Sequence, residues 1–387
     1  MSGAQLAFDE ALLPQLVALR HDLHRAPEIS GEESRTAARI AEQMAALQPD
    51  QLITGLGGHG VAAIFDSGQP GPSVLFRCEL DGLLIREIST IAWRSQVDDR
   101  GHLCGHDGHM AIVTGLACAI AARRPVRGRV IVLFQPAEET GAGAGAVIAD
   151  PAFAQLRPDF AFALHNLPGL PLGVAGIRQG ASNFASEGLR IALEGKTSHA
   201  AQPENGLSPA FALCELVSGL PELPARLGLG PEQALVTLVH ARLGEATYGI
   251  APGEAEVWAT LRSVSDEAQS GLMRAASDMA SDIARTNGLA VRTGTDDRFA
   301  ACTNDPEATT HVERAFAAEG VTVEPLSRPF RWSEDFGLFG SVAKSALFVL
   351  GAGVDHPRLH NPDYDFPDAL IPLGARLFER IARDLCG

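Results

Sequence analysis

Short apolar runs alternate with helical patterns through the first half of the chain. Four runs are almost unbroken in apolar residues and are bounded by Gly, Pro or Asp, which is typical of strands covered on both faces. They lie at residues 60–65, 73–80, 129–135 and 159–166. Apolar spacing and capping signals predict helices at residues 8–25, 34–47, 107–123 and 142–150. Because strands and helices alternate from residue 73 onward, the pattern predicts a mainly parallel α/β sheet with helices on both faces.

The pattern changes near residue 183. Three segments then alternate apolar and polar positions, as half-exposed strands do, and helices are predicted between them. The strands are "SEGLRIALEG", "EQALVTLVHARLG" and "EAEVWATLRSV", and the helices cover residues 209–219 and 266–287. With "LAVRTGT" as a closing strand, this segment forms an α+β sandwich. The predicted domains are therefore a divided one, 1–182 with 296–387, and an inserted one, 183–295.

Charge and composition narrow the classes of function. Of 387 residues, 46% are hydrophobic and 20% are charged, which describes a globular chain. The formal charge is 31 minus 47, or −16, and no run of Lys and Arg is present, which argues against nucleic acid as a partner. The first 25 residues lack a basic segment followed by an apolar one, and no 18 apolar residues run together. We therefore expect a cytoplasmic protein without membrane association.

Cys104 differs in its surroundings from the other five cysteines. No CxxC pair is present, which argues against a disulfide framework and a zinc ribbon. Cys104 lies among histidines and glycines in "GHLCGHDGHM", residues 101–110, and it stands with His106 in a loop before a predicted helix. A thiolate and an imidazole that converge there favour a borderline-soft divalent ion. The pair alone is also compatible with a reactive thiol, or with a loop histidine that has no special role.

Further chemically active residues follow the predicted strands. Asp81 follows the second run, Glu138 and Glu139 follow the third in "FQPAEET", and His165 ends the fourth. Because the carboxyl ends of parallel strands share one edge of a sheet, we expect these groups to lie together. Adjacent side chains in extended backbone point in different directions, so one glutamate can bind a metal while the other faces the bound water. His360, in "RLHNPDYDF", is a further candidate ligand from a loop near the C-terminus.

The chain resembles a known enzyme family in a series of motifs that cover nearly its whole length. They are "LRHDLHRAPEISGEE", "CGHDGH", "FQPAEE", "ALHNLPGLPLG", "GKTSHAAQPENGLSP", "SEDFGLF" and "LHNPDYDFPDALI". These motifs are similar to those of N-acyl amino acid amidohydrolases, the branch of the aminoacylase and carboxypeptidase metallopeptidases that includes hippurate hydrolases and indole-acetyl-amino acid hydrolases. The resemblance implies a metal-dependent hydrolase. It would split the amide bond of acetyl-, benzoyl- or aryl-acetyl-amino acids into a carboxylic acid and a free amino acid.

The resemblance also implies roles for individual residues. Two divalent ions per subunit, of Mn, Zn, Co or Ni, would be held by five ligands, one of which bridges both ions. The ligands are Cys104 (bridging), His106, Glu139, His165 and His360. Glu138 would be the general base, and Asp81 would orient a ligand. His199 would reach the substrate carbonyl oxygen from the partner subunit, in a homodimer formed through the inserted lid domain.

Several positions around the implied substrate site depart from the family pattern. They are Glu79, Gly82 and Leu84 in the stretch that usually ends in D-A-L-P, Thr140 at a usual glycine, and Gly249 at a usual asparagine. These departures leave all five implied metal ligands in place and affect the contacts to substrate. Arg262, in "TLRS", is the candidate that would bind the substrate carboxylate.

The altered positions leave other hypotheses open. A dipeptidase, or an aminohydrolase that releases an aromatic amine, would use the same scaffold. A metal-binding protein without turnover belongs to a different class, and Glu138 argues against it, because a pure binder has no use for a second carboxylate beside the ligand. A cysteine hydrolase would lose activity when Cys104 is alkylated and would ignore chelators. For the metal enzyme, EDTA would remove activity, and Mn, Co or Zn would restore it.

Overall fold

The computed structural model describes residues 6–387 and divides the chain into two compact units. The main unit contains the described residues up to Ser182, together with Cys302–Ser327 and Asp335–Gly387. The inserted unit contains Asn183–Ala301 and Arg328–Glu334. The expected insertion spanned 183–295, whereas this unit runs to Ala301 and takes in a second, short segment. Within residues 6–387, none of the helices combines the length and the apolar character needed to cross a bilayer.

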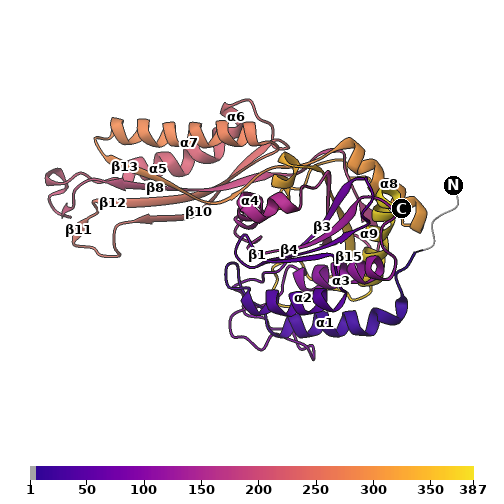
Figure 1. Cartoon of the computed structure of the whole chain (residues 1–387). Helices are drawn as coiled ribbons and strands as arrows, with labels where there is room; N and C mark the ends of the chain where they lie inside the picture. Colours follow the sequence, from indigo (N-terminus) through magenta and orange to yellow (C-terminus); the bar gives the residue numbers. More distant parts are fainter. Residues whose placement is uncertain (1–5) are drawn as a thin grey trace. The chain divides into compact units, whose positions relative to one another are not determined.

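A sheet of mixed direction forms the centre of the main unit (Figure 1). Its strand order is β1-β2-β4-β3-β5-β15-β6. The strands are β1 (Gln51–Leu56), β2 (Gly60–Asp66), β3 (Ser73–Glu79), β4 (Arg129–Gln135), β5 (Phe160–Pro168), β6 (Ala175–Gly176) and β15 (Lys344–Gly353). The four central strands β4, β3, β5 and β15 are parallel. β2 runs antiparallel to β1 and β4, and β6 to β15. The predicted mainly parallel sheet is confirmed, with antiparallel strands added at its edges.

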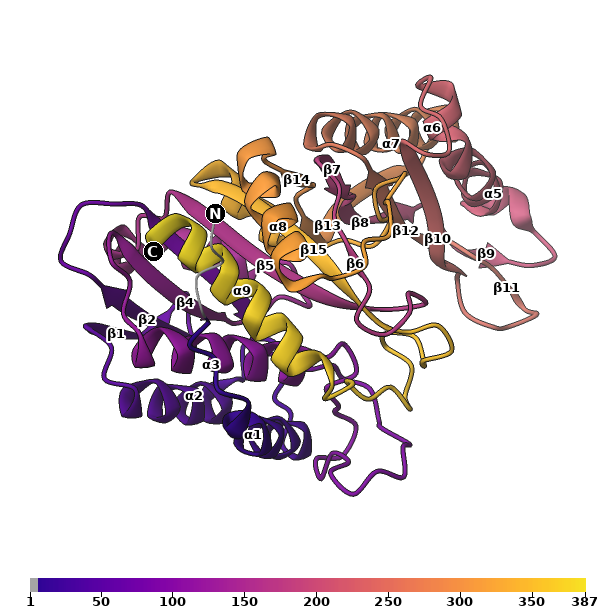
Figure 2. The ribbon, with the colours of Figure 1, turned by 90° about the vertical axis from the view of Figure 1, so that its right-hand side faces the viewer.

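Helices cover both faces of this sheet, as the pattern predicted. Their bounds are α1 (Leu13–Arg25), α2 (Ser34–Ala46), α3 (His106–Ala122), α4 (Gly143–Ala149), α8 (Pro306–Glu319) and α9 (Leu370–Cys386). Figure 1 shows α1, α2 and α3 on one side of the sheet and α4 on the other. In Figure 2, α8 and α9 lie side by side against the sheet, and α9 also packs on α3.

The register of the parallel strands brings their carboxyl ends to one edge. Glu79, the last residue of β3, pairs with Gln135, the last residue of β4. Arg77 of β3 pairs with Ala163 of β5, which puts His165 level with Glu79. The loops that follow β3 and β4 therefore start beside His165, as expected for a parallel sheet.

The inserted unit is an antiparallel sheet with helices on one face (Figure 1). The strands, in sheet order, are β10 (Ala234–Leu243), β12 (Glu254–Ser263), β8 (Ala185–Glu194) and β13 (Ala290–Phe299). The helices are α5 (Ala210–Gly219), α6 (Leu223–Arg226) and α7 (Asp266–Thr286). Buried and more exposed positions alternate along β12, and the buried ones join an apolar core with α5 and α7. The predicted α+β sandwich is confirmed.

Four short strands complete the set of strands in the described chain. They are β7 (Gly180–Asn183), β9 (Ser198–His199), β11 (Ile250–Ala251) and β14 (Cys302–Asn304). β9 and β11 pair with each other in an antiparallel ribbon, which carries His199. A lid or dimerisation role for the inserted unit stays a prediction.

Candidate metal centre

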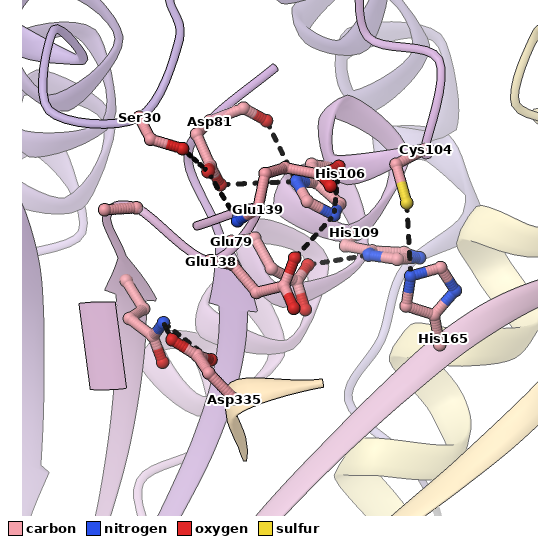
Figure 3. A network of polar contacts seen from close by, with 12 residues as sticks. Ser30, Glu79, Asp81, Cys104, His106, His109, Glu138, Glu139, His165 and Asp335 are labelled. Carbon is pink, nitrogen blue, oxygen red and sulfur yellow. Dashed lines mark hydrogen bonds and ion pairs between the residues drawn. The ribbon is translucent and has the colours of Figure 1, made fainter. Parts of the chain in front are cut away.

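The loop before α3 and strand β5 bring a thiol and two imidazoles together. Cys104 and His106 stand on either side of Gly105, whose φ of 92° turns the chain into α3. His165 comes from β5, and its Nε2 lies 3.5 Å from the Cys104 Sγ (Figure 3). One ligand atom from each of these three residues lies within 4.8 Å of the others. The group is buried, so a metal ion there would be largely shielded from solvent.

A second group of donors shares Cys104 with the first. It adds Glu139, from the loop after β4, and His360, from the loop between β15 and α9, again with ligand atoms within 4.8 Å. His360 Nε2 lies 3.6 Å from Glu139 Oε2. The backbone N–H of His360 donates to the Leu103 carbonyl at 2.8 Å, which fixes this loop beside Cys104. His360 has a positive φ of 66°, a conformation that non-glycine residues rarely adopt. All five predicted ligands therefore lie together, and their metal binding stays a prediction.

Hydrogen bonds fix which nitrogen of each buried histidine faces the centre. His106 Nδ1 lies 2.9 Å from the carbonyl oxygen of Asp81, and His165 Nδ1 lies 2.7 Å from that of Asn166. A carbonyl only accepts, so each Nδ1 carries a hydrogen and each Nε2 is the ring nitrogen left to face the centre. His106 Nε2 is buried and has no hydrogen-bond partner among residues 6–387. Such an atom needs a proton or a cation beside it, so the site fits a bound metal.

A thiolate at Cys104 would require a cation beside it. Burial, reinforced by the carboxylates of Glu139 and Glu138, raises the pKa of the Cys104 thiol well above its usual value. The thiol therefore stays protonated unless a positive ion replaces the proton. His165 is buried as well, and its pKa is lowered to about 3, so this imidazole is neutral and can act as a ligand.

Carboxylates surround His106, and Asp81 lies behind it. Burial lowers the pKa of His106, but the nearby Glu79, Asp81 and Glu139 outweigh that effect and raise it to about 10. Burial raises the pKa of Asp81, yet hydrogen bonds outweigh it and keep the pKa below the usual value. Asp81 Oδ2 accepts from the Ser30 hydroxyl at 2.7 Å and from the Glu139 N–H at 2.9 Å. Asp81 thus contacts two predicted ligand residues, one through its carbonyl and one through its carboxylate.

The adjacent glutamates do not lie in extended backbone, which corrects one expectation. Residues 138–141 form a turn, and Ala137 at its start has a φ of 51°. Glu138 Oε2 and Glu139 Oε1 are both 3.8 Å from His106 Nε2, so both carboxylates face the same imidazole (Figure 3). Opposite side-chain directions therefore do not distinguish Glu138 from Glu139. What distinguishes them is that the Glu139 carboxylate also lies next to His360 Nε2.

Comparison with known proteins identifies the family. Residues 75–384 match the model of peptidase family M20/M25/M40. The chain belongs to this family. N-acetylcysteine deacetylase of Bacillus subtilis (strain 168) is 28% identical over 381 residues, which cover 97% of each protein. Hippurate hydrolase of Campylobacter jejuni is 26% identical and covers 96% of this chain and 98% of its own. A solved dinuclear metal-binding peptidase of the M20 family from Bacillus subtilis is 25% identical, with a TM-score of 0.82 over 97% and 99% of the two chains. The family and the hydrolase class predicted from the motifs are confirmed.

Three predicted site residues of this M20/M25/M40 chain belong to the inserted unit. His199 is exposed on β9 and pairs with Ile250 of β11. The carbonyl of Gly249 accepts from the backbone N–H of Ala200 at 3.1 Å. Arg262 on β12 donates through Nη1 to the Ser333 hydroxyl at 2.8 Å. The roles of these three residues in substrate binding stay predictions.

Sequence reasoning missed part of the support around the ligands. Glu79, noted only as a departure, accepts from His109 Nδ1 at 2.7 Å, and His109 Nε2 accepts from the Asn166 N–H at 3.2 Å. Asn166 follows His165 directly in "ALHNLPG", and its place next to a predicted ligand is the sequence signal that could have identified it. Ser30, in the first motif, was missed as well.

Proposed function

We propose that this M20/M25/M40 chain is a two-metal amidohydrolase that cleaves N-acyl amino acids into a carboxylic acid and a free amino acid. The observation that carries this proposal is the shared position of Cys104 in two groups of possible metal ligands at one sheet edge. The names of the relatives support the substrate class, because N-acetylcysteine and hippurate are both small N-acyl amino acids.

Cys104 would bridge the two ions. His106 and His165 would complete one group of ligands with it, and Glu139 and His360 the other. This mixture of sulfur, nitrogen and oxygen donors suits Zn, Mn, Co or Ni. When bound, the two ions would lower the pKa of a water toward about 7 and polarise the amide carbonyl of the substrate.

Glu138 would move the proton. Its carboxylate faces the ligand group at 3.8 Å from His106 Nε2 and is not needed to complete either set of donors. It would take the proton of the attacking water and deliver it to the leaving amine nitrogen as the C–N bond breaks. One proton is moved per turnover, so the carboxylate ends each cycle as it began.

The inserted unit would supply the substrate contacts. We propose that Arg262 binds the carboxylate of the amino acid and that His199, from the partner subunit, donates to the carbonyl oxygen on which negative charge develops. Gly249 offers no side chain beside His199, so the substrate contact of the usual asparagine would be lost here. This difference bears on which amino acid is preferred.

Dimerisation through β10 is supported by a contrast between the two edge strands of the inserted sheet. β13 carries exposed charges, such as those of Arg292 and Asp296, which protect an edge from pairing. β10 carries one exposed charge, on Arg242, and also exposes Val239 and Leu243, at 58% and 40%. A second copy of the chain would cover this edge in the proposed homodimer. The cytoplasmic location stays a prediction.

Metal removal combined with a substrate panel tests the proposal. Protein treated with EDTA is reloaded with Mn, Zn, Co or Ni, and incubated with acetyl-, benzoyl- and indole-acetyl-amino acids while free amine is measured. We expect no amine from the metal-free protein and restored release with at least one metal. Activity that survives EDTA would contradict the metal mechanism. Metal binding without release of any amine would support a metal-binding protein without turnover.

Two glutamine variants form a matched pair. Glu138→Gln should retain both ions while turnover falls by about 10²- to 10⁴-fold, because only the proton carrier is lost. Glu139→Gln should bind less metal, because a ligand is weakened. If Glu138→Gln loses metal instead, the two roles are exchanged.

Alkylation of Cys104 separates this proposal from a cysteine hydrolase. Alkylation of the metal-loaded enzyme should be slow, whereas alkylation of Cys104 in the metal-free protein should block reloading with metal.

A further inference from the structure

Asn166 lies behind the ligand cluster and bonds to several of its parts. It is 1% exposed and follows His165 in β5. Its carbonyl oxygen accepts from His165 Nδ1 at 2.7 Å, which leaves His165 Nε2 directed at the Cys104 Sγ. A side chain this deeply buried is fixed in one orientation by its partners, so each of its bonds constrains the group on the other side.

The side-chain amide of Asn166 connects two further ligand-bearing segments. Nδ2 donates to the backbone carbonyl of Cys104 at 2.7 Å. Oδ1 accepts from the hydroxyl of Tyr364, which is fully buried and stands four residues after His360. One amide therefore ties the loop of the bridging thiol to β5 and to the C-terminal loop. An amide offers a donor and an acceptor side by side at any pH, whereas an ionised carboxylate of the same shape can only accept.

Gly105 gives independent support for this fit. A Cβ atom at position 105 would lie 2.3 Å from Asn166 Nδ2 and 3.0 Å from the Tyr364 hydroxyl. The amide thus occupies the space beside the backbone between Cys104 and His106, which only glycine leaves open. The φ of 92° at Gly105 also favours glycine. The backbone that carries two of the ligands is shaped around the Asn166 side chain.

We propose that Asn166 is a positioning residue that sets the geometry of the bridging thiol and of His165, and that Tyr364 extends its hold to the loop of His360. The inference rests on the proposed function, since it concerns a metal pair held by these ligands. Partners that orient metal ligands change metal affinity by about 10- to 100-fold when they are replaced. Asn166 acts through Cys104 and His165, and does not itself contact the metal.

Cobalt titration of three variants tests the proposal. Asn166→Asp keeps the size of the side chain but, once ionised at the alkaline pH of the titration, places an acceptor oxygen opposite the Cys104 carbonyl. Tyr364→Phe removes a single hydroxyl and is the milder variant. It serves as the test if Asn166→Asp is too unstable to fold. Asn304→Asp is the matched control, because Asn304 is also buried in the main unit and bonds through its amide to Leu347 and Arg178. The probes are Co²⁺ affinity by chelator competition, the near-ultraviolet thiolate-to-Co²⁺ absorption band, and the melting temperature.

We expect Asn166→Asp to bind Co²⁺ about 10- to 100-fold more weakly, with an altered thiolate band. Tyr364→Phe should change both readouts in the same direction by a smaller factor. Asn304→Asp should lower the melting temperature and leave both readouts at wild-type values. A Co²⁺ affinity and a thiolate band at wild-type values in Asn166→Asp would overturn the proposal; if only Tyr364→Phe folds, the same result in that variant would do so. An equal loss of Co²⁺ affinity in Asn304→Asp would also overturn it. If the wild-type protein itself binds no Co²⁺, the proposed function fails instead.

Discussion

His24 provides a prediction whose size follows from the structure. The side chain lies on α1 and is fully buried, with Nδ1 2.8 Å from Asp107 Oδ2 and Nε2 3.3 Å from Glu87 Oε2. Burial lowers the pKa of His24, but the charge of Asp107, its hydrogen bond with Nδ1 and the nearby Glu87 carboxylate outweigh burial and raise the pKa to about 9. The folded protein therefore holds a proton on His24 that the unfolded chain releases near pH 6.5.

The sign of the effect follows from proton uptake. Below pH 6.5 both states carry the proton, and the stabilising contribution of His24 is fully present. Between pH 6.5 and about 9 only the folded state binds it, so the free energy of unfolding falls as the pH rises. This interval of roughly 2.5 pH units, at about 1.36 kcal/mol each, amounts to ~3 kcal/mol.

The assay compares wild type with His24→Gln by urea unfolding in EDTA at pH 6 and pH 10. Taking the difference between the two proteins at each pH cancels the titrations that they share. We expect wild type to be more stable than the variant at pH 6 and this advantage to shrink by ~3 kcal/mol at pH 10. His59→Gln, at a half-buried histidine between β1 and β2, is the control. An advantage of the same size at both pH values would refute a protonated His24 in the folded protein.

Three further variants test a buried ion pair, the packing at Gly105 and the proposed dimer interface. Arg77→Met removes the buried cation that faces both Glu79 and Asp335 and should cost about 3–5 kcal/mol in urea unfolding; a loss below about 1 kcal/mol would contradict the dependence of these two carboxylates on Arg77 for charge compensation. Gly105→Ala should lower the melting temperature and weaken metal binding, because the new Cβ has no room beside the side-chain amide of Asn166. Equilibrium dialysis with Zn²⁺ measures metal binding, and unchanged binding would contradict the packing argument. Val239→Asp should convert the proposed dimer to monomer in sedimentation, and a dimer that persists would place the interface elsewhere.

The strand edge of the site was predictable because its causes are local. Short apolar runs end at turn residues, and the carboxyl ends of parallel strands meet at one edge. Asp81 and Glu138 each follow such a run within a few residues, and His165 ends one. β1 escaped prediction because it is an edge strand whose residues are mostly exposed or half-exposed, so it has no apolar run to reveal it.

Other parts of the site depend on contacts that no local pattern encodes. His360 stands far along the chain, and its place is set by a bond to the Leu103 carbonyl and by its own left-handed backbone. The sequence offered it as a candidate ligand, and the family resemblance gave it a role. The turn that begins at Ala137 was also unforeseen, because alanine rarely adopts a positive φ. Asn166 went unrecognised because a single amide near the end of a predicted strand does not by itself indicate a role, and its bonds are to partners from distant segments.

The order in which the donors occur along the chain limits when the centre can form during synthesis. Cys104, His106, Glu139 and His165 leave the ribosome first, and the whole inserted segment up to Ala301 must follow before His360 is made. A growing chain can assemble the first set of donors early but has only part of the second. For the proposed pair of ions, the second set of donors would therefore be complete only after His360 has been made.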